Sequence, residues 1–170
     1  MRRLLCLCLA LSLLLSAAPA RAEEPISVLS QSVESRYRDA FIFRVTARST
    51  VGKIVAARLI WRVRAFSANL AYRVEVAQPA PQVDLEYTWL LRQETMPPWQ
   101  VIFYRWELID DQGNRYRTPE AEAEISDSTR PWQKLSDGKV AVYWYAREDA
   151  FGEALLEVAQ RGFAHVARAT

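Results

Sequence analysis

The chain has 170 residues, of which 51% are hydrophobic and 25% charged, and its formal net charge is +2 at pH 7. This length suffices for one sandwich domain of about 100 residues and a smaller unit. The near-neutral charge balance gives no reason to expect a nucleic-acid partner.

Residues 1–22 are predicted to be a cleaved signal peptide. Two arginines precede an apolar run from Leu4 to Leu15, and Ala20-Arg21-Ala22 is the small-x-small pattern before a cleavage point. The run is shorter than the about 20 residues that span a bilayer. We therefore expect a secreted, extracytoplasmic protein, cut after Ala22 and without a membrane anchor.

Cleavage would remove both cysteines, Cys6 and Cys8. A lipid anchor on one of them is the competing hypothesis, but leucine precedes each cysteine where small residues are required. The mature chain would hold no disulfide. It would keep 19 basic and 20 acidic residues, which gives a net charge of about −1.

Residues 23–126 are predicted to form one β-sandwich. Apolar and polar residues alternate with a period of two from Ile26 to Ile125, which is typical of antiparallel strands with one buried face. The alternation covers residues 41–48, 55–64, 70–76, 83–91 and 101–108. We expect Trp61 at the centre of the core. The predicted fold is a fibronectin III/Ig-like sandwich. Because no cysteine pair flanks Trp61, the fibronectin III type fits better than the antibody type.

The pattern changes after Ile125. Residues 127–138 are predicted to be a polar linker, and residues 139–170 a strand followed by a helix. The strand at 139–145 is apolar on both faces, so we expect it to be covered on both sides. The helix carries one apolar stripe. That stripe consists of Phe151, Leu155, Val158, Gly162 and Val166. The predicted fold is therefore mainly β, a sandwich with a C-terminal strand–helix appendage.

Basic residues are concentrated in the first half of the predicted sandwich. They are Arg36, Arg38, Arg44, Arg48, Lys53, Arg58, Arg62, Arg64 and Arg73. One hypothesis is a surface for an anionic polymer such as a cell-wall glycan. The other, which we favour, is pairing across strands, because the third strand should face the sixth and place these arginines near Glu107 and its neighbours.

The role of the six tryptophans can be interpreted in two ways. Five of them are candidates for a sugar-binding platform: Trp89, Trp99, Trp106, Trp132 and Trp144. Most tryptophans fall on the apolar side of their strands, so packing in the core is the favoured interpretation. Trp99 is the exception, because it follows Pro97-Pro98 in a predicted loop where it would be exposed.

No catalytic, cofactor-binding or metal-binding residue is predicted. The segment from Asp110 to Asn114 faintly resembles a calcium loop but lacks the alternating oxygen ligands, and its glycine suits a hairpin turn. His165 is the only histidine, and neither the glutamate nor the second histidine of a zinc H-E-x-x-H motif accompanies it. We expect His165 to be a solvated helix residue.

The C-terminal third resembles a known family. The motifs are Trp132-Gln133-Lys134-Leu135, Gly138-Lys139-Val140, Tyr143-Trp144-Tyr145 and Phe151-Gly152-Glu153-Ala154-Leu155-Leu156, after a hairpin at 104–114. In this order they resemble the entry into the peptidase MA-like (gluzincin) domain of secreted bacterial metallohydrolases, which follows an N-terminal β-sandwich. The resemblance covers most of residues 26–168 and implies a zinc peptidase-like domain further along, but no position here matches a zinc ligand.

These observations predict an exported, non-catalytic accessory or interaction module equivalent to the N-terminal region of such a metallohydrolase. The chain would be either a fragment or a natural short form, and not an enzyme as it stands. The alternative is a standalone ligand- or glycan-binding sandwich that uses Trp99 and the arginine-rich strands. A third hypothesis is that the strand and helix associate with a separately encoded protein or with a second copy. The expected partner is thus a protein or a cell-surface glycan.

Overall fold

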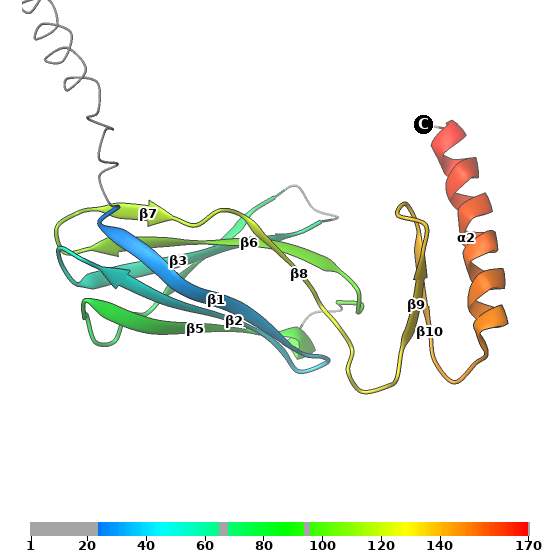
Figure 1. Ribbon diagram of the computed structural model, residues 1–170, viewed down its shortest axis with the longest axis horizontal. Coiled ribbons are helices and arrows are strands. Elements are labelled where there is room, and N and C mark those ends of the chain that lie inside the picture. Colours follow the sequence, from blue (N-terminus) through cyan, green and yellow to red (C-terminus); the bar gives the residue numbers. More distant parts are fainter. Residues whose placement is uncertain (1–23, 65–67, 94–95, 170) are drawn as a thin grey trace, which may run out of the picture.

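The computed structural model describes residues 24–64, 68–93 and 96–169. The predicted signal peptide, its cleavage point and both cysteines lie outside these residues. The described chain forms two packed antiparallel sheets, and a hairpin and one long helix lie beyond one end of them (Figure 1). The mainly β fold with a sandwich and a C-terminal helix is therefore confirmed.

Each sheet is built from strands distant in sequence. The first has the order β1-β2-β5, with β1 at Ile26–Arg36, β2 at Ala40–Ser49 and β5 at Gln82–Leu90, after which η2 covers Leu91–Gln93. The second has the order β4-β3-β6-β7, with β3 at Ile54–Val63, β4 at Leu70–Val74, β6 at Val101–Asp110 and β7 at Arg115–Arg117. Strand β8, at Ala121–Glu124, pairs with β6 beyond β7.

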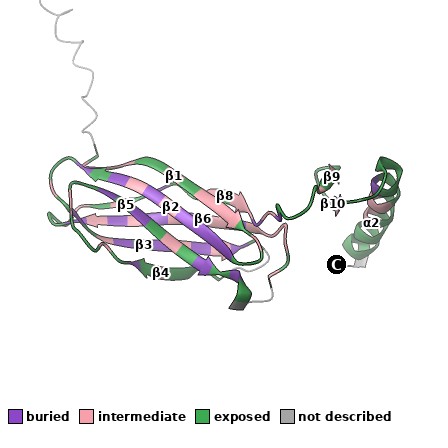
Figure 2. Cartoon of the chain, turned by 90° about the horizontal axis from the view of Figure 1, so that it is seen from below, coloured by how far each residue is buried: buried purple, intermediate pink, exposed green. Residues whose placement is uncertain are grey.

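The core fills the space between the two sheets with large aromatic side chains. Trp61 lies at its centre as predicted, only 2% exposed. Its ring centroid is 4.2 Å from that of Trp89 and 6.4 Å from that of Phe43, so it joins both sheets. Figure 2 shows buried and exposed residues alternating along the sandwich strands. This is the period of two that the sequence carries, and burial of such rings dominates the stability of a domain of this size.

A buried polar contact also joins the two sheets at one end. The Ser49 hydroxyl donates to the Asp110 carboxylate at 2.9 Å, and the Asn114 backbone N–H donates to the same group at 2.9 Å. Burial raises the pKa of Asp110, but the hydrogen bonds from Asn114 and Ser49 outweigh burial and hold the pKa below its usual value. Gly113 has a φ of 81°, so the turn after β6 uses the left-handed conformation that the sequence predicts.

The C-terminal unit is a hairpin covered by a helix. Strands β9 (Gln133–Ser136) and β10 (Ala141–Trp144) form a two-stranded sheet, and helix α2 (Asp149–Ala169) packs along it. Strand β9 lies inside the segment predicted to be a linker. The sequence does not predict this strand because only Leu135 of its four residues is apolar, so no alternation of apolar and polar residues is visible. The strand predicted at 139–145 is β10, which covers the shorter range Ala141–Trp144 and pairs with β9. We call residues 133–169 the hairpin–helix unit.

Candidate functional site

In the described chain, four of the nine basic residues in the first half of the sandwich form ion pairs with acidic neighbours, so the favoured pairing hypothesis holds for part of this set: Arg36, Arg44, Arg62 and Arg64. Arg44 contacts Glu34 and Glu86, each at 2.8 Å, in the first sheet. In the second sheet Arg62 contacts Glu120 at 3.1 Å and Arg64 contacts Glu122 at 2.9 Å. Arg58 lies opposite Glu107 in the register of β3 and β6, but no ion pair joins these two side chains. Compensation is therefore incomplete in that part of the sheet.

The two residues considered as possible metal ligands, Asp110 and His165, lie at a hairpin turn and on the surface of a helix. The carboxylate of Asp110 accepts hydrogen bonds from its own turn and from Ser49, which agrees with a hairpin turn and leaves little capacity for an ion. His165 is exposed on α2. In the described ranges no group of three or more histidine, cysteine, aspartate or glutamate side chains is arranged to hold a metal ion. Within the same residues no helix has the length and apolarity needed to cross a membrane.

An aromatic cluster joins the sandwich to the hairpin–helix unit. The ring of Trp99 stacks on that of Tyr143 at 4.3 Å with an interplanar angle of 5°. Trp132 meets Trp99 edge-on at 5.6 Å and Tyr145 edge-on at 4.7 Å. We call these four residues the aromatic joint. Trp99 is half-buried here, not exposed as the sequence suggested, because β10 brings Tyr143 against one face of its ring.

Polar contacts and one unusual backbone conformation fix the aromatic joint. The Tyr143 hydroxyl donates to Glu124 at 2.8 Å, and burial raises the pKa of that hydroxyl. Trp132 donates from Nε1 to the buried carboxylate of Asp127 at 3.1 Å. Trp99 has a φ of 67°, a conformation costly for a bulky residue, and its N–H donates to the Ile125 carbonyl at 2.7 Å. Such a conformation persists only where neighbouring contacts hold it.

A groove runs between the sandwich and the hairpin beside the aromatic joint. Its volume is about 700 Å³, and Trp99 and Tyr143 form part of its wall. The charges along it are largely paired, since Arg64 contacts Glu122 and the Lys134 ammonium lies 3.6 Å from Glu124. The groove therefore offers ring surfaces and neutralised polar groups.

Helix α2 packs on the hairpin through a face that sequence periodicity does not single out. Gly152 lies against the ring of Trp144, where a Cβ would come within 2.3 Å of ring carbon atoms. Gln160, two turns on, donates to Asp137 at 2.8 Å. Gly152 follows Phe151 directly, and successive residues are about 100° apart around a helix. The close approach at Gly152 thus turns the predicted apolar stripe about a quarter-turn away from the hairpin.

The predicted stripe is consequently exposed. Phe151 is 48% exposed, Val158 56% and Val166 61%. Leu155 is half-buried and Gly162 is exposed. Figure 2 shows exposed residues covering most of α2, in contrast with the sandwich strands. We call Phe151, Leu155, Val158, Gly162 and Val166 the helix stripe. Exposed apolar side chains gathered on one face are typical of surfaces that contact another molecule.

No family model and no curated protein matches this chain. Two solved structures share a limited likeness. One is a structural-genomics target, SoR45, with 10% sequence identity, a TM-score of 0.35, and coverage of 61% of this chain and 83% of that chain. The other is the putative ApaA protein from Bordetella pertussis, with 18% identity, a TM-score of 0.32, and coverage of 61% and 93%. At these TM-scores neither likeness supports a statement about fold or function.

Proposed function

We propose that this chain is an exported, non-catalytic interaction module that docks onto a protein partner through the helix stripe. The observation that carries the proposal is the exposure of that stripe while the neighbouring face of α2 packs on the hairpin. An apolar surface on a rigid helix suits a protein groove, since i, i+4 and i+7 side chains are the usual anchors of a helix in such a groove.

The position of the helix stripe supports the proposal. The aromatic joint holds the hairpin against the sandwich, and α2 packs on the hairpin, so the stripe is presented on a supported surface. Supported surfaces bind with less loss of conformational entropy than mobile segments do. The fibronectin III-like character that the sequence suggests also belongs to this proposal, and the sheet orders β1-β2-β5 and β4-β3-β6-β7 agree with it.

The resemblance to gluzincin-like metallohydrolases gives the proposal its biological setting. In that family the sandwich precedes a zinc peptidase-like domain, and the present chain would correspond to the region before the zinc site. Export would follow from the predicted signal peptide. A purified mature chain that hydrolyses peptides, with activity abolished by a chelator and restored by zinc, would overturn the non-catalytic part of this proposal.

The docking surface is tested with two variants. Val158→Glu places a charge in the middle of the helix stripe, whereas Glu157→Gln alters the adjacent position outside it. Candidate partner proteins would be captured from the extracytoplasmic fraction and re-expressed in pure form. Their affinity for the mature chain would then be measured by calorimetry. We expect defined stoichiometry, loss of binding with Val158→Glu and retention with Glu157→Gln. If no pure protein, including a second copy of the chain, distinguishes the two variants, the proposal fails.

A second candidate function is binding of an uncharged glycan in the groove. The observation that favours it is the ring surface of Trp99 and Tyr143 beside paired charges. Lys139 lines the same groove, is exposed and lies outside the aromatic joint. On a glycan array, we expect binding that Lys139→Ala weakens and Trp99→Ala abolishes. Absence of binding, or binding indifferent to both changes, would exclude this function.

A further inference from the structure

A row of charged side chains crosses the outer face of the second sheet from β4 to β7. The register places Arg73 opposite Arg58, Arg58 opposite Glu107, and Glu107 opposite Arg117. Arg115 lies two residues before Arg117 on β7 and points to the same face of the sheet. We call these five residues the arginine row.

The arginine row carries more positive than negative charge. Its four arginines surround one carboxylate, and among the described residues only Arg117 forms an ion pair with Glu107. Further along the same face the situation differs, because Arg62 contacts Glu120 and Arg64 contacts Glu122. Charge compensation therefore ends at the arginine row.

Arg58 and Arg73 oppose each other directly, and both are exposed. Like charges at directly opposed positions of two strands destabilise the pairing. An oxyanion placed between them would reverse this repulsion. Guanidinium groups suit that task, because their planar donors can bind a carboxylate, sulfate or phosphate with two parallel hydrogen bonds.

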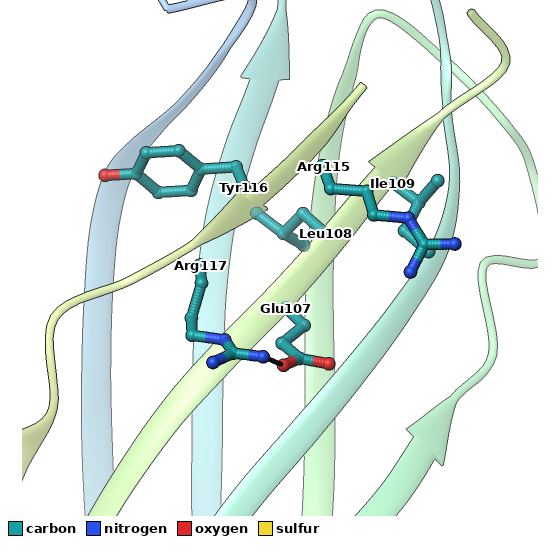
Figure 3. Close-up of a pocket in the computed structure, with 6 residues that line it drawn as sticks. All are labelled: Glu107, Leu108, Ile109, Arg115, Tyr116 and Arg117. Carbon is teal, nitrogen blue, oxygen red and sulfur yellow. Dashed lines mark hydrogen bonds and ion pairs between the residues drawn. The ribbon is translucent and has the colours of Figure 1, made fainter. Parts of the chain in front are cut away.

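Two shallow hollows give the arginine row an apolar floor. One, of about 420 Å³, lies over β3 and β4 and includes Ala56 and Ala71, whose small side chains leave space between the arginines. The other, of about 130 Å³, lies over β6 and β7 (Figure 3). Glu107 and Ile109 line both hollows, so the two adjoin.

The close-up of the smaller hollow shows how its side chains are directed. Arg117 reaches toward Glu107, Arg115 lies beside Ile109, and the ring of Tyr116 points away from Glu107 (Figure 3). The arginine row thus offers cationic groups and aliphatic floor atoms without an aromatic platform. Single-stranded nucleic acid is usually held by stacked aromatic rings, so this surface favours a different polyanion.

We propose that the arginine row binds an anionic polysaccharide whose carboxylate or sulfate groups pair with Arg58, Arg73 and Arg115. The aliphatic floor suits the apolar C–H face of a sugar ring, and the rim suits the charged substituents. Neighbouring strands lie about 4.8 Å apart, so the row spans about 14 Å from β4 to β7 and requires a ligand with several anionic groups. The site goes beyond the proposed function, because it lies on the sandwich and not on α2.

The experiment measures the affinity of the mature chain by calorimetry at physiological ionic strength. The probes are a polygalacturonate oligosaccharide, which carries carboxylates, and a heparin oligosaccharide, which carries sulfates; neutral dextran is the control. We expect binding to at least one charged probe and none to dextran. Arg58→Ala and Arg73→Ala should each weaken it about ten-fold or more, since charge-assisted hydrogen bonds are lost.

Two further variants separate a site from general charge attraction. Arg48→Ala removes an exposed arginine of the first sheet, and we expect it to leave the affinity unchanged. Glu107→Gln removes the competing carboxylate and should tighten binding several-fold. Arg73→Ala should not lower the urea midpoint of unfolding, because it removes a like-charge opposition.

Four results would overturn the proposal. They are the absence of binding to both charged oligosaccharides, equal weakening by Arg48→Ala and Arg73→Ala, equal or tighter binding to a single-stranded oligonucleotide, and equal or tighter binding to phosphatidylglycerol vesicles. The vesicle result counts against the proposal only where Arg73→Ala weakens vesicle binding, because an exposed apolar helix face such as the helix stripe can itself bind a bilayer surface. The other three results do not depend on the helix stripe, so a failure here is distinguishable from a failure of the proposed docking function.

Discussion

The sandwich and the hairpin–helix unit are stabilised in different ways. The sandwich encloses its apolar side chains between two sheets, with Trp61, Phe41 and Phe43 almost inaccessible to solvent. The hairpin–helix unit buries little beyond Val142, Trp144 and Gly152, and one side of its helix remains apolar and exposed. From this comparison we expect the first region to fold by itself and the second to depend on a few contacts with its surroundings.

The largest effect is expected from Trp61→Ala in the sandwich core. Removal of this ring leaves a cavity among Trp89, Phe43 and Tyr72, which typically costs about 3–5 kcal/mol of unfolding free energy. Urea denaturation followed by fluorescence measures it. Leu90→Ala, at a position 50% exposed on the same sandwich, is the control and should change stability by less than about 0.5 kcal/mol. Equal effects would contradict the central place of Trp61.

Gly152→Val should separate the two regions. Any side chain at position 152 collides with the ring of Trp144, and overpacking of this kind costs about 1–3 kcal/mol. We expect hydrogen exchange to accelerate throughout α2 while the strands β2, β3 and β6 keep their protection. Gly162→Ala is the matched control, because no atom outside the adjoining helix backbone lies within 4 Å of the new methyl group and alanine favours the helix by about 1 kcal/mol. Uniform loss of protection in the sandwich would show that the regions fold as one unit.

Trp99→Gly should loosen the aromatic joint without unfolding either region. The substitution removes the stack on Tyr143, worth about 1 kcal/mol beyond buried area, while glycine accepts the φ of 67° without strain. Residual dipolar couplings would report the orientation of β10 relative to β6. We expect the fixed orientation of the native chain to become averaged; an unchanged orientation would assign the junction to Trp132 and Asp127 instead.

The smallest effect concerns the turn of the hairpin at low pH. The backbone N–H groups of Val140 and Lys139 and the side chain of Gln160 donate to Asp137 and lower its pKa from 3.8 to about 2. A lowered pKa stabilises the folded state above the unfolded pKa, and this contribution is lost as pH falls through the folded pKa.

Between about pH 4 and pH 2 the contact between the turn and α2 should therefore weaken, and it should be constant above pH 5. Carbon-13 titration of the Asp137 carboxyl group measures the pKa, and amide shifts of Gln160 follow the contact. In Asp137→Asn the Gln160 shift should lose its pH dependence in this window. A carboxyl titration near pH 4 would contradict the hydrogen bonds described for the turn.

The sequence predicts the sandwich well because burial on one face leaves a direct trace in the alternation of side chains. It also predicts Trp61 at the centre and the left-handed glycine of the turn after β6. It does not reveal β9, because Gln133, Lys134 and Ser136 are polar and the strand is covered by few neighbours. The alternation of apolar and polar residues therefore predicts a strand only where one face of that strand is buried.

The surfaces proposed for function depend on facts that sequence pattern does not contain. The helix stripe is visible in the sequence, but its exposure follows from the contact between Gly152 and Trp144, which sets the rotation of α2. The opposition of Arg58 and Arg73 depends on the register of β3 and β4. The stack of Trp99 depends on where the hairpin is placed. The sequence held a signal for the first two of these features, namely a glycine beside the predicted stripe and an arginine on each of two neighbouring strands.

The two-stranded sheet of the hairpin has a consequence for behaviour at high concentration. In the described chain neither β9 nor β10 pairs with a third strand, so both outer edges offer free backbone donors and acceptors. Open edges of this kind are templates for the addition of foreign strands and for aggregation. Here each strand has only four residues, and Lys134 projects from β9. Short length and a charged side chain are two features by which natural sheets resist the addition of further strands, and we expect them to limit aggregation of the hairpin while the apolar face of the helix stays exposed.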